Sequence, residues 1–401
     1  MILEAGEEGV LQHLTHLEEL ILTNKKSGLD MALSFLGELY KTFKGETKSK
    51  VFTTIKFDGA PAIITGFNPE NNKFFVSTKS LGNINPKVNY TDQDIDMNHG
   101  HAPGLVKKLK LALRYLPEVI KQGMYQGDFM FDRDELKSVN VDGEDLIAFK
   151  PNTITYAVEA NSELGSKIKN AIIGVIFHTR YSGPNLANLK KSSDVNIAEF
   201  GSSPNVFIDD AKFKDVSGQA TFTSEEAIKF RTAIDSIKSS GESIKWEEIP
   251  ESIYPFLNTF INSLIRDGRF VGDPHTDYEA FATWITTKLN KEVEKLKTPM
   301  GQEKKKKALN DFLHHLNQVR HNVINIMDLT KKLDDAKRMI IDKYNAAIQT
   351  KQFIAQPDGS LKVTAPEGYV AVDHLGNMVK LVSRLEFSKA NFSVSKGEKF
   401  K

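Results

Sequence analysis

One short stretch of the sequence, Thr53 to Phe67, places a lysine, an aspartate and a glycine between two strand-like apolar runs: TTIKFDGAPAIITGF. Lysine and aspartate are poor strand formers, and a glycine followed closely by Pro61 interrupts a β-ladder. A lysine amine is a nucleophile only when it has lost its proton, and an ordinary pKa of about 10.4 keeps it protonated. The stretch therefore indicates either an ordinary hairpin edge or a nucleophilic Lys56 whose pKa is lowered by nearby cations, a metal ion or partial burial.

The composition limits the classes of protein that this chain can belong to. Its 401 residues, 40% hydrophobic and 26% charged, are typical of a globular protein with two domains or one domain carrying a large insertion. The sequence contains no run of about 18 apolar residues, so it predicts no membrane span. The absence of cysteine excludes disulfides, thiolate zinc sites and cysteine nucleophiles. It also favours a cytoplasmic location, which for a viral protein would be the cytoplasm of the host. The net charge of +1 argues neither for nor against a nucleic-acid partner.

The periodicity of apolar residues changes several times along the chain. It predicts helices in about the first 45 residues, and short strands then begin at Lys50 and continue, around one helix near 104–123, to about residue 182. Helical periodicity returns between about 224 and 350, and strand patterns follow it. We therefore expect an α+β protein with a discontinuous, antiparallel-sheet domain at 1–215 and 352–401. An all-helical inserted domain is expected at 216–351.

Several short segments, in order, resemble the motifs of one enzyme superfamily. IKFDGAPA resembles the nucleotidyl-lysine motif of the covalent nucleotidyltransferases, which include DNA ligases, RNA ligases and messenger-RNA capping enzymes. STKSLGN, YQGDFMF, IIGVIFHT, EGYVAV and MVKLV are similar to the later motifs of that superfamily, and the resemblance covers the β-rich half of the chain. It implies the nucleotidyltransferase (ATP-grasp-like) fold and a lysine that attacks the α-phosphate of ATP.

The resemblance also implies a role for each matching residue. Lys56 is the catalytic nucleophile that carries AMP, Asp58 sits beside the ribose and the hydrated metal, and Gly59 allows close approach of the backbone. The remaining implied contacts are Ile55 beside the nucleotide, Lys79 and the catalytic Lys380 at the α-phosphate, Asp128 at the ribose hydroxyl, Phe177 stacked on the adenine, and Glu367 with Asp58 at Mg²⁺, or Mn²⁺ in its place.

A plainer interpretation exists for most of these residues. Lys56 could be an edge-strand lysine, and Asp58 with Gly59 could form a hairpin turn. Glu367 could belong to a turn after Pro366. Lys79 could be a solvated charge, and Phe177 could be an ordinary core residue. Many ligases also close the site with Lys-x-Lys, whereas this chain has Val382 at the position of the second lysine. Either Arg384 or Lys389 takes over the role of that lysine, or the contact with the phosphate is weaker.

The expected substrate is a polynucleotide. Only about 20 residues follow Lys380, too few for the OB-fold of typical DNA ligases, so the resemblance is closest to phage-type RNA ligases. These join 3′-hydroxyl and 5′-phosphate ends in three steps, and we expect a monomer whose helical insertion, with basic segments such as TKLNKEVEKLK and QEKKKKALNDF, holds the strand. The alternatives are a minimal DNA ligase that uses the insertion in place of an OB-fold, and a catalytically dead relative that binds nucleic acid.

Overall fold

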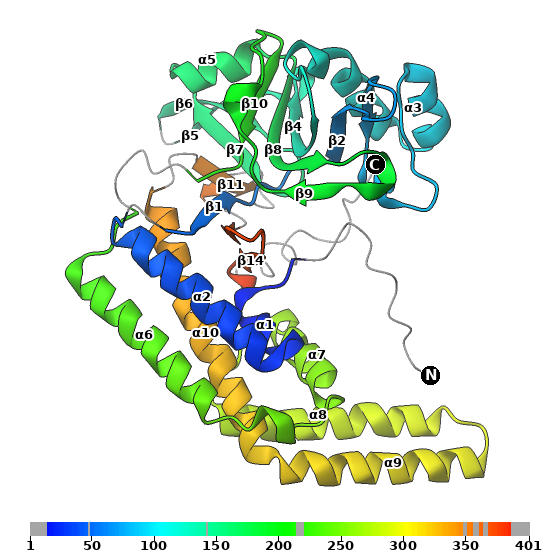
Figure 1. The fold of residues 1–401 in the computed structure, drawn as a ribbon, viewed down its shortest axis with the longest axis vertical. Coiled ribbons are helices and arrows are strands. Elements are labelled where there is room, and N and C mark those ends of the chain that lie inside the picture. The colour runs from blue at the N-terminus through cyan, green and yellow to red at the C-terminus, as the bar shows by residue number, and fades with distance from the viewer. Residues whose placement is uncertain are drawn as a thin grey trace. The chain divides into compact units, whose positions relative to one another are not determined.

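The chain forms two compact units, which are described separately here (Figure 1). A computed structural model describes residues 14–46, 49–141, 143–213, 220–347, 351–355, 361–363 and 368–385. The first unit comprises Met1–Leu14, Phe52–Lys214 and Ile348–Asn377, and the second comprises Thr15–Val51, Asp215–Ala347 and Met378–Lys401. Within the described ranges, no helix is both long enough and apolar enough to cross a membrane.

The first unit is built on an open six-stranded sheet. Its strand order is β10 (Val206–Asp210), β8 (Ile173–Ser182), β4 (Met124–Asp132), β2 (Ala62–Phe67) and β3 (Phe74–Ser77), with β9 (Lys190–Ser192) paired to β8. The pairs are antiparallel, as the sequence predicts, except that β10 runs parallel to β8. The expected α+β class is confirmed, whereas the expected all-antiparallel sheet is corrected to a mixed one. The parallel pair is reached through the connection that contains β9.

Further elements flank this sheet. Helix α4 (Pro103–Tyr115) packs Leu109 and Ala112 against one face, in a core that also contains Tyr125 and Phe129 of β4. Helices α3 (Asp92–His99) and α5 (Glu163–Asn170) complete the unit. A second, five-stranded sheet has the order β12 (Leu361–Val363), β11 (Lys351–Ala355), β7 (Thr155–Glu159), β6 (Glu144–Phe149) and β5 (Lys137–Val141), and β1 (Val51–Ile55) pairs with β13 (Tyr369–Asp373).

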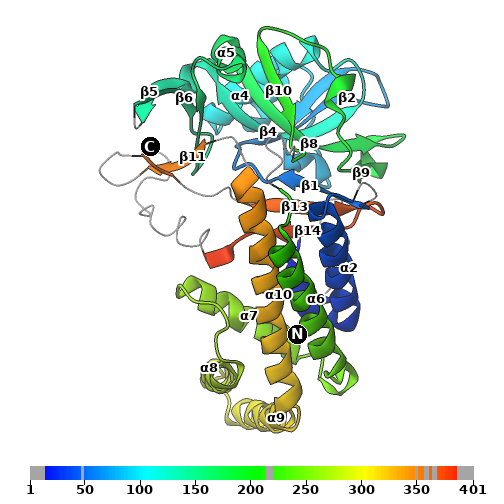
Figure 2. The ribbon, with the colours of Figure 1, turned by 90° about the vertical axis from the view of Figure 1, so that its left-hand side faces the viewer.

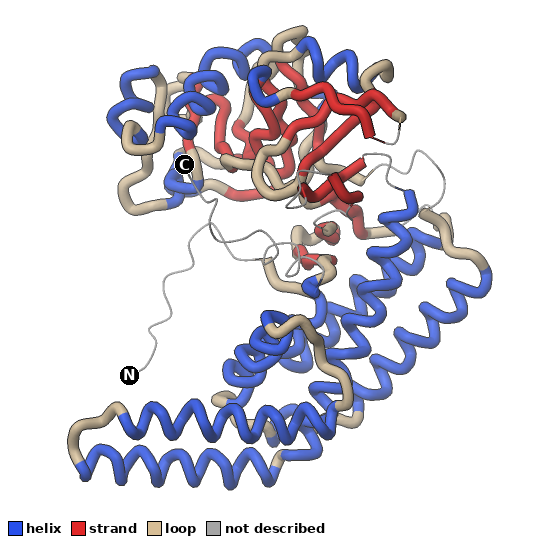
Figure 3. The backbone as a smooth tube through the Cα atoms, turned by 180° about the vertical axis from the view of Figure 1, so that it is seen from behind, coloured by secondary structure: helices blue, strands red, loops and turns tan. Residues whose placement is uncertain are grey.

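The second unit is mainly helical: α2, α6 and α10 lie side by side, and α8 and α9 form a hairpin that runs across one end of them (Figures 2 and 3). The helices of this unit are α1 (Leu20–Thr23), α2 (Lys25–Phe43), α6 (Ser224–Glu242), α7 (Ile253–Arg266), α8 (Pro274–Glu294), α9 (Pro299–Gln318) and α10 (Arg320–Ala347), with strand β14 at Met378–Leu381. Short 3-10 helices lie at Leu17–Glu19 and Trp246–Glu248 in this unit, and at Lys79–Gly82, Leu116–Glu118, Arg133–Glu135, Leu186–Asn188 and Ile197–Glu199 in the first.

The helical unit combines distant parts of the chain. Thr15–Val51, which contains the N-terminal helices, and Met378–Lys401, which contains β14, group with Asp215–Ala347. The reason is apolar packing between distant segments. The ring of Phe43 lies 4.8 Å from that of Phe222 and 4.9 Å from that of Tyr344, and Gly241 of α6 leaves room for Leu29 of α2.

A network of buried charges lies inside the helical unit. The ammonium of Lys337 is 2.7 Å from a carboxylate oxygen of Glu18 and 2.8 Å from one of Asp334, and all three side chains are at most 3% exposed. Arg384 lies 3.6 Å from Glu18, and Arg338 lies 2.7 Å from Asp334. Charges removed from water are tolerated only when they are paired in this way.

Candidate functional site

The segment that carries Lys56 follows β1 and is held by backbone hydrogen bonds. The N–H of Ile55 donates to the carbonyl of Ala211 at 2.7 Å, and the N–H of Lys56 donates to the carbonyl of Gly368 at 2.8 Å. Gly368 has a φ of +146°, a conformation that glycine adopts readily and other residues rarely do. The sequence prediction that the chain leaves the strand at Lys56 is confirmed, because β1 ends at Ile55.

The carboxylate of Asp58 accepts hydrogen bonds from other residues of the chain. One of its carboxylate oxygens accepts a hydrogen bond from Asn152 Nδ2 at 2.7 Å, and the other accepts from the backbone N–H groups of Thr153 at 2.7 Å and Ile154 at 3.0 Å. The N–H of Asp58 donates to the hydroxyl of Tyr156 at 2.6 Å. Three of the roughly four acceptor positions of a carboxylate are therefore used. Asp58 fixes the connection between β6 and β7 to the Lys56 segment, and we do not assign it a metal.

Gly59 brings the same segment against β4. A methyl group added at Gly59 would meet the Cβ of Asp128 at 2.4 Å and the sulfur of Met130 at 3.0 Å. The N–H of Ala60 donates to the carbonyl of Phe129 at 3.1 Å. Only a residue without a side chain fits between the two backbones. The expected close approach at Gly59 is therefore present, and it brings the backbone of the lysine segment next to Asp128.

Asp128 faces away from the core that α4 covers. Side chains alternate along a strand, and Tyr125 and Phe129 of β4 are buried in that core, so Asp128 points to the opposite face of the sheet. Its side chain is 20% exposed. The next strand, β8, presents His178 beside it, with the Nε2 of His178 3.8 Å from the Oδ2 of Asp128. The two adjacent strands thus place an acid and an imidazole together on one face.

A β-bulge occurs at His178. Gln126 pairs with Thr179 and Gly127 pairs with Phe177, so His178 is the extra residue between two consecutive pairs of the β4–β8 ladder. Bulges of this kind occur often beside active sites. The Nδ1 of His178 is 2.8 Å from the hydroxyl of Thr179, which limits rotation of the ring.

Two lysines act electrostatically on this imidazole. Burial first, and then the positive charges of Lys79 and Lys56, lower the pKa of His178 from 6.5 to about 4. His178 is therefore neutral at pH 7, which avoids placing a third cation near the two lysines. Lys79 is exposed and begins the 3-10 helix Lys79–Gly82, whose first turn is capped by Thr78. Four residues from separate segments, Lys56, Lys79, Asp128 and His178, form what we call the lysine–acid cluster.

Phe177 does not belong to this cluster. Its side chain is fully buried, and its ring lies 5.3 Å from that of Phe200 and 6.0 Å from that of Tyr125. A ring without exposed surface cannot stack on an adenine, so the expected stacking role is corrected to core packing, the plainer interpretation that the sequence left open. The strand alternation that turns Phe177 inward leaves the next residue, His178, on the polar face.

Glu367 and Lys380 are the two remaining expected residues. Glu367 lies outside the described residues. Lys380 lies on β14 of the second unit, where its N–H donates to the carbonyl of Thr15 at 2.9 Å. Burial and the charges of Arg384, Lys337 and Lys380 lower the pKa of His16 in that unit to about 2. The role of Lys380 at a phosphate stays a prediction.

The described residues contain no group of three or more histidine, aspartate or glutamate side chains arranged to hold a metal ion. Mg²⁺ that accompanies a nucleotide takes most of its ligands from phosphate oxygens and water, so one or two carboxylates suffice. Asp58 is engaged by the chain and Glu367 is not described, so the described residues do not make up the expected pair of ligands. We derive no step through a metal.

Sequence reasoning missed His178. The available signal was a polar residue inside the apolar strand pattern IGVIFHTRY, directly after Phe177. A bulge depends on how two distant strands pair, and a single sequence does not reveal that register.

Comparisons with known proteins add a family but no activity. The profile of DUF6267, described as a family of unknown function, matches residues 11–396. No curated protein and no solved structure matches the chain.

Proposed function

This chain belongs to DUF6267, a family of unknown function, and we propose that it is an ATP-dependent polynucleotide ligase of the RNA-ligase type. The observation that carries the proposal is the lysine–acid cluster. Lys56, Lys79 and Asp128 belong to three separate motifs, and they are related to one another through His178, which lies 3.8 Å from Asp128 and whose pKa both lysines lower. Motif matches that arise by chance have no reason to converge in space.

In the first step, the unprotonated amine of Lys56 attacks the α-phosphorus of ATP. A nitrogen–phosphorus bond forms, the bond from that phosphorus to the bridging oxygen breaks, and pyrophosphate leaves with the electron pair. The positive charge of Lys79 favours the negative charge that develops on the phosphate oxygens. Asp128 accepts a hydrogen bond from a ribose hydroxyl. The Asp58 and Gly59 contacts hold the lysine segment in place, and good orientation contributes a large part of catalysis in such reactions.

In the two later steps, AMP passes from Lys56 to a 5′-phosphate of a polynucleotide, and a 3′-hydroxyl then attacks that phosphate and releases AMP. Each transfer exchanges one bond to phosphorus for another, so no oxidant or reductant is needed.

The test is the covalent intermediate. Purified protein is first treated with pyrophosphate to remove any AMP already attached, and it is then incubated with Mg²⁺ and ATP and measured by intact mass. We expect a gain of one AMP per chain that is lost in Lys56→Ala and retained in Lys73→Ala, an exposed lysine in the turn before β3. No adduct from ATP, GTP or NAD would refute the ligase. If an adduct forms, sealing of nicked duplex DNA rather than RNA ends would instead favour the DNA-ligase alternative.

A further inference from the structure

The far end of the α8–α9 hairpin carries a high density of positive charge. We call residues 288–307 the hairpin tip; they include the end of α8, the connecting turn and the first half of α9. The tip holds eight lysines and three glutamates, a net charge of +5, whereas the whole chain has a net charge of only +1. The rest of the chain is therefore acidic overall, and the tip is a local exception.

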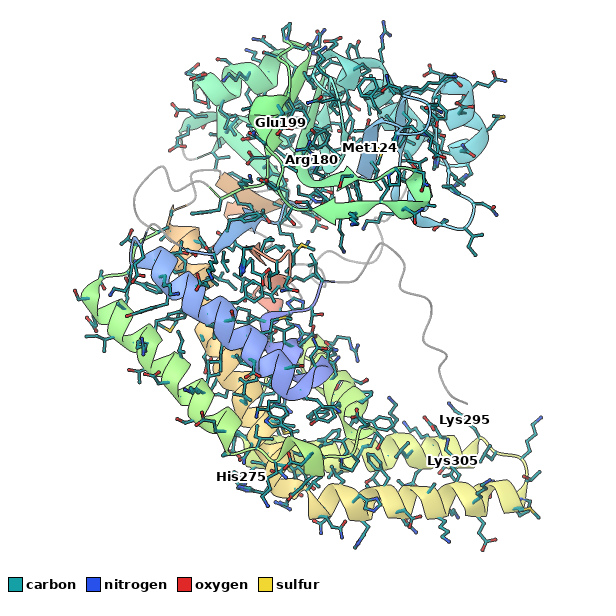
Figure 4. All side chains as sticks on the ribbon, in the orientation of Figure 1. Met124, Arg180, Glu199, His275, Lys295 and Lys305 are labelled. Atoms are coloured by element: carbon teal, nitrogen blue, oxygen red, sulfur yellow. The ribbon has the colours of Figure 1, made fainter. Side chains whose placement is uncertain are left out.

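Most of these lysines have their charge directed to solvent. Lys305 forms an ion pair with Glu292 at 2.9 Å, and the ammonium of Lys288 lies 4.8 Å from the ring centre of Trp284. The other six are not paired with any acidic side chain among the described residues, and each is exposed: Lys291, Lys295, Lys297, Lys304, Lys306 and Lys307. Figure 4 shows Lys295 and Lys305 near the turn of the hairpin, and His275 at the opposite end of α8.

The hairpin uses its apolar residues for its own packing. Ile285 and Val293 of α8 and Leu309 and Leu316 of α9 are all at most 6% exposed. Met300, at 82% exposure, is a single apolar side chain at the turn. A helix that lies in a membrane surface needs a broad apolar face in addition to its lysines. The tip instead offers repeated single charges on a polar surface, which suits a flexible polymer of regularly spaced phosphates.

We infer that the hairpin tip binds the phosphate backbone of a polynucleotide strand without reading its sequence. The inference deepens the proposed function and rests on it for the choice of a nucleic acid as the polyanion. Lysine contacts to phosphate position a strand and do not specify bases. Binding should therefore depend steeply on salt, because each phosphate that is neutralised releases counterions, about 0.7 per contact for a single strand.

The expected effect of removing three contacts follows from the same relation. Replacing Lys304, Lys306 and Lys307 with glutamine preserves helix propensity and removes three charges. The slope of log K against log salt should become shallower by about 2. If both proteins bind equally at about 1 M salt, this corresponds to a roughly 100-fold weaker affinity at about 0.1 M. Lys305 is left in place because it is paired with Glu292.

The measurement is fluorescence anisotropy of a labelled single-stranded RNA of mixed sequence across a salt series. The matched control is Lys26→Gln, Lys229→Gln and Lys238→Gln, which removes three exposed lysines from α2 and α6 of the same unit. Circular dichroism checks that both variants remain helical. A weaker, less salt-dependent association only in the tip variant supports the inference, and equal effects in both variants overturn it.

Two further arms separate the alternatives. Vesicles containing phosphatidylserine replace RNA in one arm, and binding to vesicles without binding to RNA overturns the inference in favour of a membrane surface. AMP loading of Lys56 is measured in the other arm, because it needs no polynucleotide and should be equal in both variants. A protein that never loads AMP but whose tip variant loses RNA binding would refute the ligase and leave RNA binding at the tip supported. A protein that loads AMP but whose tip variant binds RNA as tightly as wild type would support the adenylylation chemistry and refute RNA binding at the tip.

Discussion

Replacing Lys337 with methionine should destabilise the helical unit by about 3–5 kcal/mol, the range found when one partner of a buried ion pair is removed. The ammonium is fully buried between Glu18 and Asp334. At an effective dielectric constant of about 20, one contact at this separation corresponds to roughly 6 kcal/mol of Coulomb attraction, before the cost of desolvation. After the change, Asp334 still has Arg338 at 2.7 Å, whereas Glu18 has Arg384 only at 3.6 Å. The loss of stability in this variant should therefore come mainly from the buried carboxylate of Glu18, which is left without a close cation.

Urea unfolding followed by tryptophan fluorescence measures this loss in the correct unit, because both tryptophans of the chain, Trp246 and Trp284, lie in the helical unit. The matched control is Lys331→Met on the same helix, α10. Lys331 is 43% exposed and lies 3.7 Å from Asp335, and exposed pairs of this kind contribute about 0–1 kcal/mol.

A double variant tests the physical reason. Glu18→Gln combined with Lys337→Met removes the unpaired charge, so it should be more stable than the sum of the two single changes predicts, by about 1–3 kcal/mol. If Lys337→Met lowers the free energy of unfolding by less than about 1 kcal/mol, water or a rearrangement of nearby side chains must compensate the buried charge of Glu18. Strict additivity in the double variant would equally refute the argument.

Three further outcomes are expected. The folded pKa of His16 is lowered from 6.5 to about 2, so the stability that its neutral form contributes is present above pH 6.5 and lost as the pH falls. At pH 4.5 the wild-type protein should have lost about 2–3 kcal/mol on this account, and urea unfolding at pH 7 and 4.5 should show this loss in wild type and not in His16→Asn. His178→Ala should lower the rate of AMP loading at pH 7 about five- to tenfold, because it removes the side chain that lies 3.8 Å from Asp128 and limits the positions of that carboxylate. His178→Gln, which still fills much of this space, should be less affected, and equal rates in a quenched time course would contradict this role. Gly59→Ala should lower the melting temperature and AMP loading together, because its methyl group meets Asp128 and overpacking costs about 1–3 kcal/mol; an unchanged melting temperature would mean that the segment moves freely.

The local pattern of the sequence was enough to find most elements. The apolar spacing of the segment from Gly28 to Phe43 predicts the helix observed as α2, and the change of pattern at Lys50 predicts β1. Element ends were less accurate for identifiable reasons. The helix expected near 104–123 ends at Tyr115, because Pro117 lies in the 3-10 turn that follows it. The helical pattern expected from about residue 224 begins as α6 at Ser224, directly after Thr223, which forms a capping box with Glu226.

The sequence named Lys56, Lys79 and Asp128 as single positions in separate short motifs, but it did not reveal the contacts around them. That Asp58 would be held by residues 152–154, and that Lys79 would act on His178, depends on contacts between distant segments. The assignment of the N-terminal helices to the helical unit has the same cause, since an amphipathic face shows that a partner exists without showing which segment it is.

The helical insertion affects the order in which a growing chain can fold. Strand β11 at residues 351–355 pairs with β7 at residues 155–159, so the five-stranded sheet cannot be completed until the ribosome has made the whole insertion. Phe222, before α6, and Tyr344, near the end of α10, both contact Phe43, so a folded insertion has its two ends near one another. The effective loop between the two strands then shortens about threefold, which lowers the entropy cost of closing it by about 1 kcal/mol. During synthesis, an insertion that has already folded would thus bring β11 close to β7 and help the remaining strands of the sheet to pair.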